Sequence, residues 1–198
     1  QGPDGVIQKE WKDHTGIPQF LDFGLKSAAD WPAFRERFLP NPARIPADLD
    51  KQIATAESSG APIAITVAPM MGWIRNWMGV ENMAYLMHDA PDVYADIVDT
   101  LAELSCWSID QVMQRMQTAP ALAVGWEDIC FRSGPLINPA FFERYVAPGY
   151  RKIRHKLASY DIRLLAVDCD GYIEPLLGPW LEAGVNLHYP VEIGVWKA

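Results

Sequence analysis

Leu122-Ala123-Val124-Gly125-Trp126 is a short apolar run that ends in two acidic residues, Glu127-Asp128. Similar apolar, β-branched runs occur at residues 63–67, 163–167 and 185–189, and segments with helix-like patterns separate them. This repeating order predicts parallel strands joined by helical crossovers, which is an α/β fold. Four such strands are too few to close a barrel, so the sequence allows an open sheet or a barrel whose other units lie outside it.

Each crossover has its own helix signals. We expect helices over residues 80–87, 92–116, 139–159 and 173–182. Asn138 and Pro139 are a cap and a first-turn residue, and Pro148 should bend the helix that follows because proline lacks a backbone donor. The strand at residues 63–67 is apolar enough to be buried on both faces.

Residues 1–60 form an irregular excursion before the regular units at 61–198, within a single domain of residues 1–198. Turn signals predict a hairpin that pairs residues 6–7 with 20–23. Helices are expected over residues 29–38 and 48–58. The chain starts without Met and stops just after strand-like text, so we expect it to be a piece of a longer domain.

Composition limits the classes of partner. Apolar residues make up 49% and charged residues 21%, with a net charge of −8. This acidity disfavours nucleic acid and anionic membranes, and no apolar run reaches the roughly 18 residues of a membrane span. The three scattered cysteines predict reduced thiols and a cytoplasmic location.

Acidic residues end three consecutive strands. Glu127 with Asp128, Asp168 with Asp170, and Glu192 should meet at one face, because the carboxyl ends of parallel strands share an edge. Their repulsion must be offset by a cation, a proton or a positive substrate group.

One interpretation of these acidic residues is that Asp168, Asp170 and Glu192 bind a metal. The other is that the carboxylates cap the following helices or pair with arginine. Strand alternation points Cys169 away from both aspartates, which predicts a structural role for it.

His188 follows the fourth strand and is interpreted either as a ligand or base, or as a buried histidine with satisfied hydrogen bonds. Together with Asp168 and Glu127 it makes up the predicted catalytic set. Arg132 lies close enough to the second strand to bind a substrate carboxylate or to neutralise Glu127.

The stretch Met70-Met71-Gly72-Trp73-Ile74-Arg75-Asn76-Trp77-Met78 is rich in Met and Trp. It predicts ordinary packing or an apolar wall for a flat ligand, with Arg75 as a cation in that wall. The residues expected to contact substrate are Trp73, Arg75, Trp126, Arg132 and Tyr172.

Several segments together resemble the uroporphyrinogen decarboxylase family. They are residues 79–91, Gly125-Trp126-Glu127-Asp128, residues 133–139 with Phe142, Pro148 and Tyr150, Asp168-Cys169-Asp170-Gly171, residues 181–186 and Pro190-Val191-Glu192. The similarity covers most of residues 61–194. It implies a (β/α)8 TIM barrel with its site at the carboxyl ends of the strands, incomplete here because full members are considerably longer.

The branch that this chain resembles contains corrinoid-dependent methyltransferases. Those enzymes bind zinc through a His-x-Cys pair at a strand end, where this chain has Asp168 and Asp170. The difference permits a harder divalent metal bound through oxygen, or no metal. The arginine-rich motif of true decarboxylases is missing.

The resemblance therefore implies an enzyme that moves a methyl group from a small, methoxylated substrate to a corrinoid on a partner protein. One alternative is a cofactor-free uroporphyrinogen decarboxylase of tetrapyrrole biosynthesis, and another is a non-catalytic binding subunit. A homodimer is compatible with each of these hypotheses.

Overall fold

The computed structural model describes Gly2, residues 4–13, Gly16 and residues 18–195. Its main element is a parallel sheet with the strand order β3-β4-β7-β8. The strands are β3 (Ala64–Thr66), β4 (Leu122–Trp126), β7 (Leu164–Asp168) and β8 (Leu187–Tyr189). Strand order follows chain order, so each helical crossover adds the next strand on the same side, as the sequence predicts.

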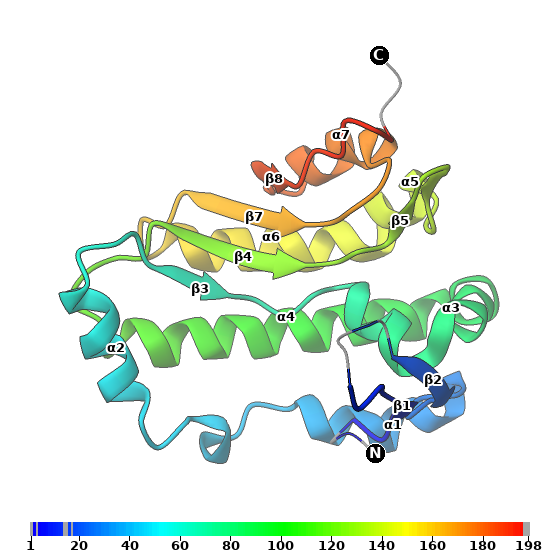
Figure 1. Cartoon of the computed structure of the whole chain (residues 1–198), viewed down its shortest axis with the longest axis horizontal. Coiled ribbons are helices and arrows are strands. Elements are labelled where there is room, and N and C mark those ends of the chain that lie inside the picture. The colour runs from blue at the N-terminus through cyan, green and yellow to red at the C-terminus, as the bar shows by residue number, and fades with distance from the viewer. Residues whose placement is uncertain (1, 3, 14–15, 17, 196–198) are drawn as a thin grey trace.

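Helices join consecutive strands. They are α3 (Gly72–Asp89), α4 (Pro91–Met113), α5 (Pro139–Phe141), α6 (Ala147–Ala158) and α7 (Glu174–Glu182). Helix α4 packs against α6, and α6 lies behind β4 and β7 in the view of Figure 1. The fold is thus a parallel α/β sheet with flanking helices. Closure of this sheet into an eight-stranded barrel stays a prediction.

The sheet face opposite these helices, here called the open face, is only partly covered. In register it carries Ala64, Thr66, Leu122, Val124, Trp126, Leu164, Ala166, Asp168, Leu187 and Tyr189. Leu164 is 41% exposed and Tyr189 is 38% exposed. The prediction that the first strand is buried on both faces is wrong, because Ala64 and Thr66 are exposed on this face. Strand β3 is also the edge of the sheet.

The N-terminal excursion contains the predicted hairpin, in which β1 (Ile7–Lys9) pairs antiparallel with β2 (Gln19–Asp22). The helix expected over residues 29–38 consists of three consecutive short segments, of which α1 (Trp31–Arg35) is the α-helical one. Helix α2 (Leu49–Ser58) agrees with the sequence. Figure 1 places the hairpin and α1 beside α3, at the end toward which the strands point.

Helix α3 begins at Gly72, whereas the sequence predicted a helix only from residue 80. The Met- and Trp-rich stretch is therefore mostly helical. The helix is broken at Gly79, whose φ of +74° interrupts the regular path, and the Phe23 ring lies against this glycine. Glycine adopts this conformation without steric cost, so the break joins two helical pieces at the place where the hairpin packs.

The crossover after β4 begins at Asn138, whose side chain accepts the N–H of Ala140, as its capping role predicts. A π-helical turn (Phe142–Val146) precedes α6, so Pro148 lies in the first turn of α6 rather than in the middle of one bent helix. This position suits proline, because first-turn N–H groups have no partner within the helix. Among the described residues, no helix combines the length and the apolar character that crossing a bilayer requires.

Candidate functional site

The ends of β4, β7 and β8 place neighbouring side chains on opposite faces of the sheet. Trp126 pairs with Asp168, and Asp168 pairs with Tyr189, so these three side chains share the open face. Glu127 and His188 belong to the helix-covered face instead. The predicted catalytic set of Asp168, Glu127 and His188 is therefore divided by the sheet.

Glu127 is fully buried, with 0% of its surface exposed. Its Oε1 accepts the N–H of Met70 at 2.7 Å, and its Oε2 accepts those of Met71 at 2.8 Å and Gly72 at 2.7 Å. The hydroxyl of Tyr150 also donates to Oε1. Four donors suit an ionised carboxylate at a helix N-terminus.

Burial raises the pKa of Glu127, while these four hydrogen bonds oppose the rise. A carboxylate that is enclosed and fully hydrogen-bonded cannot reach a substrate. Glu127 instead fixes the start of α3 against the end of β4, so the catalytic role predicted for it does not fit its position.

His188 packs against the indole of Trp180 with ring centroids 5.2 Å apart. Its Nε2 lies 3.2 Å from the carbonyl oxygen of Cys169, which can only accept, so the proton is on Nε2. Burial lowers the pKa of His188. The ring is therefore neutral and lies on the helix-covered face of the sheet. Its Nδ1 is buried without a hydrogen-bond partner among the described residues, so the expectation of a buried histidine with satisfied hydrogen bonds holds for Nε2 only.

Arg75 ties the start of α3 to the end of β4. Its Nη1 lies 3.1 Å from Oδ2 of Asp128 and also donates to the Asp128 carbonyl. The guanidinium lies over the Trp126 ring, 5.3 Å from its centroid, and Nη2 donates to Oδ1 of Asn76 at 3.2 Å. Arg75 was predicted as a cation in the Met- and Trp-rich wall, and here it lies over Trp126 and already has a carboxylate partner.

Four carboxylates gather at the open end of the sheet. Burial first, and then the negative charges of Glu192, Asp128 and Asp168, raise the pKa of Asp170. Glu192 accepts the N–H of Gly171 at 2.7 Å, which holds it beside Asp170. The expected convergence of acidic strand ends thus holds for these four residues, and it does not hold for Glu127, which is buried on the other face. These surroundings favour the protonated form of Asp170.

The predicted metal triad of Asp168, Asp170 and Glu192 does not form. Within residues 4–13 and 18–195, together with Gly2 and Gly16, no group of three His, Cys, Asp or Glu side chains is arranged to hold a metal ion. Glu192 is also engaged by a backbone N–H. The residues present do not fit a divalent cation or zinc.

The remaining predicted contacts are dispersed. Arg132 is exposed in the turn between β5 (Cys130–Phe131) and β6 (Gly134–Pro135), so it does not neutralise the buried Glu127. The hydroxyl of Tyr172 donates to Glu174. Trp73 is half-buried and packs with Phe38 and Trp77, away from the carboxylates.

Sequence reasoning placed Asp128 among the converging acidic residues but gave it no role in the site, and it missed the contact of Tyr150 with Glu127. Asp128 adopts a φ of +44°, which takes its side chain off the alternation of β4. The adjacent Glu127-Asp128 pair was the available signal, because only one of two neighbouring side chains can enter the core. Cys169 is fully buried, as its predicted structural role requires, and its sulfur accepts the N–H of Ile129 at 3.4 Å.

The fold described above has a match among solved structures. No family model matches the sequence, and no curated protein matches it either. A solved structure with a similar fold is a methyltransferase from Methanosarcina mazei, with a TM-score of 0.60 and 12% sequence identity. The match covers 92% of this chain and 51% of that one, so the chain spans about half the length of the structure it matches. At this identity, the similarity shows the fold alone.

Proposed function

We propose that this chain is part of an enzyme that transfers a methyl group from a small substrate to a corrinoid carried by a separate protein. The observation that carries the proposal is the shared fold with the Methanosarcina mazei methyltransferase over 92% of the chain. The acidic cluster at the end of the sheet supports it, because demethylation leaves a heteroatom that needs a proton.

Asp170 is the proton donor in this proposal. Burial and three neighbouring carboxylates raise its pKa, so it binds a proton more readily than an isolated aspartate. The bond between the methyl carbon and the substrate heteroatom breaks with its electron pair on the heteroatom, which takes the Asp170 proton. A reduced corrinoid supplies the nucleophile for the methyl carbon. The Asp170 carboxylate then regains a proton from water, favoured by the charges of Asp168 and Glu192.

Arg75 and Trp126 position the substrate beside this donor. Trp126 lies opposite Asp168 in the register, and its half-buried ring forms an apolar surface next to the carboxylates. The pairing of Arg75 with Asp128 holds the guanidinium over that ring. These contacts orient a small methylated compound and limit the access of water.

The test uses the whole protein with free cob(I)alamin and four donors: methanol, trimethylamine, dimethyl sulfide and 4-methoxybenzoate. Formation of methylcobalamin is followed by visible absorbance. We expect conversion of at least one donor, dependent on the protein. Failure with all four, or decarboxylation of uroporphyrinogen by the same preparation, would contradict methyl transfer, and the second result would establish the decarboxylase alternative.

A further inference from the structure

A cavity lies outside the acidic cluster, between the N-terminal excursion and the start of α3. It has a volume of about 380 Å³ and is lined by Asp4, Arg37, Phe38, Arg44, Trp73, Asn76 and Trp77. This volume falls within the roughly 300–1,000 Å³ of small-molecule sites. Helix α3, which carries Trp73, Asn76 and Trp77 of this lining, lies at the end toward which the strands point (Figure 1).

Three aromatic rings form one wall of the cavity. The ring centroids of Phe38 and Trp77 are 4.3 Å apart, those of Trp73 and Trp77 are 5.7 Å apart, and those of Phe38 and Trp73 are 6.2 Å apart. Trp77 is buried, whereas Phe38 and Trp73 keep part of their surface accessible. Mutually packed rings are rigid, and they offer a planar ligand an apolar surface at little entropic cost.

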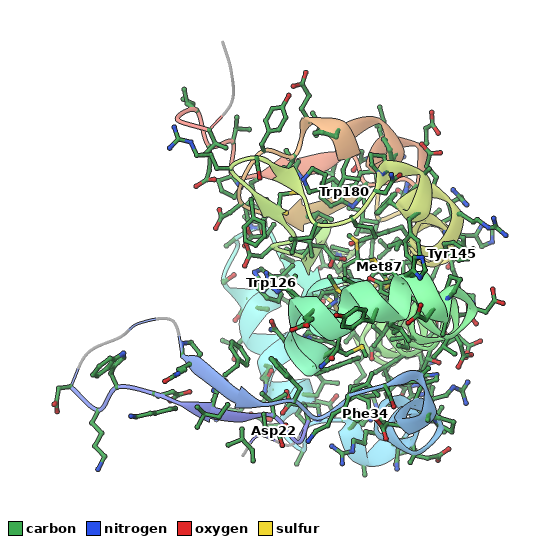
Figure 2. All side chains as sticks on the ribbon, turned by 90° about the vertical axis from the view of Figure 1, so that its right-hand side faces the viewer. Asp22, Phe34, Met87, Trp126, Tyr145 and Trp180 are labelled. Carbon is green, nitrogen blue, oxygen red and sulfur yellow. The ribbon has the colours of Figure 1, made fainter. Side chains whose placement is uncertain are left out.

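The rim carries an excess of positive charge on an otherwise acidic protein. Arg37 and Arg44 are both exposed there, against the single carboxylate of Asp4. The Arg44 Nε donates to the carbonyl of Leu39 at 3.0 Å, which holds the side chain, and the Arg37 guanidinium lies 5.0 Å from the Phe34 ring centroid. Figure 2 shows Phe34 in the same lower part of the molecule as Asp22 of the hairpin, with Trp126 above them. Two guanidinium groups at one opening match a carboxylate or a phosphate.

Asn76 adds a neutral donor. Asn76 lines the cavity, and its Oδ1 accepts N–H groups of Arg75, so its amide NH2 is the group that can donate to a ligand. The cavity therefore combines a flat apolar wall, a neutral donor and a cationic rim. An aliphatic cation does not match this set, because two guanidinium groups would repel it.

We propose that the cavity binds a planar aromatic anion, with the ring against Trp73 and Phe38 and the carboxylate or phosphate held by Arg37 and Arg44. The site does not depend on the methyl-transfer proposal, because it shares no residue with the acidic cluster. An aromatic carboxylate and a nucleotide present the same chemistry to these residues.

Matched pairs of probes test the charge. We titrate the whole protein with 2-naphthoate against 2-naphthamide, and with AMP against adenosine, and follow tryptophan fluorescence and calorimetric heat. An anion should bind at least about tenfold more tightly than its neutral partner, since hydrogen bonds to charged groups exceed neutral ones by that order. Binding of 2-naphthoate alone assigns a carboxylate, and binding of AMP alone assigns a phosphate. Equal binding of the members of each pair, or no binding of either anion, overturns the proposal.

Variants locate the site. Arg44→Gln should weaken binding of the anion about tenfold, because it removes one guanidinium from an exposed position that the fold does not need. Arg163→Gln is the control, since Arg163 is an equally exposed arginine paired with Asp161 elsewhere on the surface. Trp73→Leu should weaken the anion and its neutral partner alike. Equal affinities of the Arg44→Gln and Arg163→Gln variants, at unchanged Tm, would place the binding elsewhere and refute the assignment.

Discussion

Trp126 and Asp168 lie directly opposite each other in the pairing of β4 with β7, so both side chains point to the open face of the sheet. The next residue, Glu127, points to the other face and is buried against α6. The carboxylate of Asp168 therefore faces the proposed substrate, whereas the carboxylate of Glu127, one position after Trp126, supports the fold.

Replacing Glu127 by Gln should destabilise the protein by at least about 2 kcal/mol, because an amide NH2 would face backbone N–H groups that then lack an acceptor. Tyr150→Phe removes one donor and leaves the other three hydrogen bonds of the carboxylate in place, so its effect should be smaller. Urea unfolding of both variants measures the difference. A Glu127→Gln protein as stable as the parent would mean that the carboxylate is not the anchor of α3.

Methyl transfer should be fastest at low pH and decline as the pH rises through the pKa of Asp170, which its surroundings raise. Only the protonated form can donate to the leaving heteroatom. Asp170→Asn should lower kcat by about 10²–10⁴-fold below the pKa of Asp170, and the loss should become smaller as the pH rises above that pKa. Glu192→Gln removes one negative neighbour, so the decline should move to lower pH.

Asp161→Asn is the matched control for these activity measurements. Asp161 is exposed, pairs with Arg163, and adopts a φ of +57° that asparagine tolerates. A pH profile that stays the same in the Glu192→Gln protein would remove Asp170 from the role of proton donor.

Replacement by alanine should lower the stability of the protein at Gly171 and raise it at Gly178. Gly171 has a φ of +90°, and a Cβ there would lie 2.7 Å from the carbonyl oxygen of Cys130, so Gly171→Ala should cost about 2 kcal/mol or more. Gly178 lies within α7 with nothing near the place of a Cβ, and Gly178→Ala should stabilise by up to about 1 kcal/mol. Thermal unfolding of both variants gives the comparison, and equal Tm values would contradict it.

The free energy of unfolding should decrease as the pH falls below the ordinary pKa of histidine. Burial lowers the pKa of His188 in the folded protein, so the unfolded chain binds more protons at acidic pH. The stabilisation is complete above the ordinary value of 6.5 and is lost as the pH falls below it. His188→Phe keeps a ring against Trp180 and should reduce the slope between pH 7.5 and 5. An unchanged slope in urea unfolding would show that His188 is not responsible.

The alternation of apolar and helix-like segments was sufficient to predict parallel strands with helical crossovers, and turn residues were sufficient to predict the N-terminal hairpin. These signals were not sufficient for α3, whose start at Gly72 is held by the carboxylate of Glu127, 55 residues later in the chain. Local propensity carries no information on such a distant acceptor.

The site was predicted only in part for a related reason. A single sequence shows that strands end in acidic residues, but not how neighbouring strands are aligned. Alignment decides the face, because a shift of one residue moves every side chain to the other side. Asp168 was therefore placed correctly beside other carboxylates, whereas Glu127 was assigned to the wrong face.

The break of α3 at Gly79 has a consequence for how this protein tolerates change. A Cβ at this position would lie 2.6 Å from the ring of Phe23, and the backbone there is in a conformation that other residues rarely adopt. Random mutagenesis should therefore find almost no accepted replacement at Gly79. Many replacements should be accepted in the exposed strands of the hairpin. Sequence drift in the excursion is limited less by the exposed hairpin strands than by the contacts that the excursion makes with α3, among them Phe23 at Gly79 and Phe38 at Trp77.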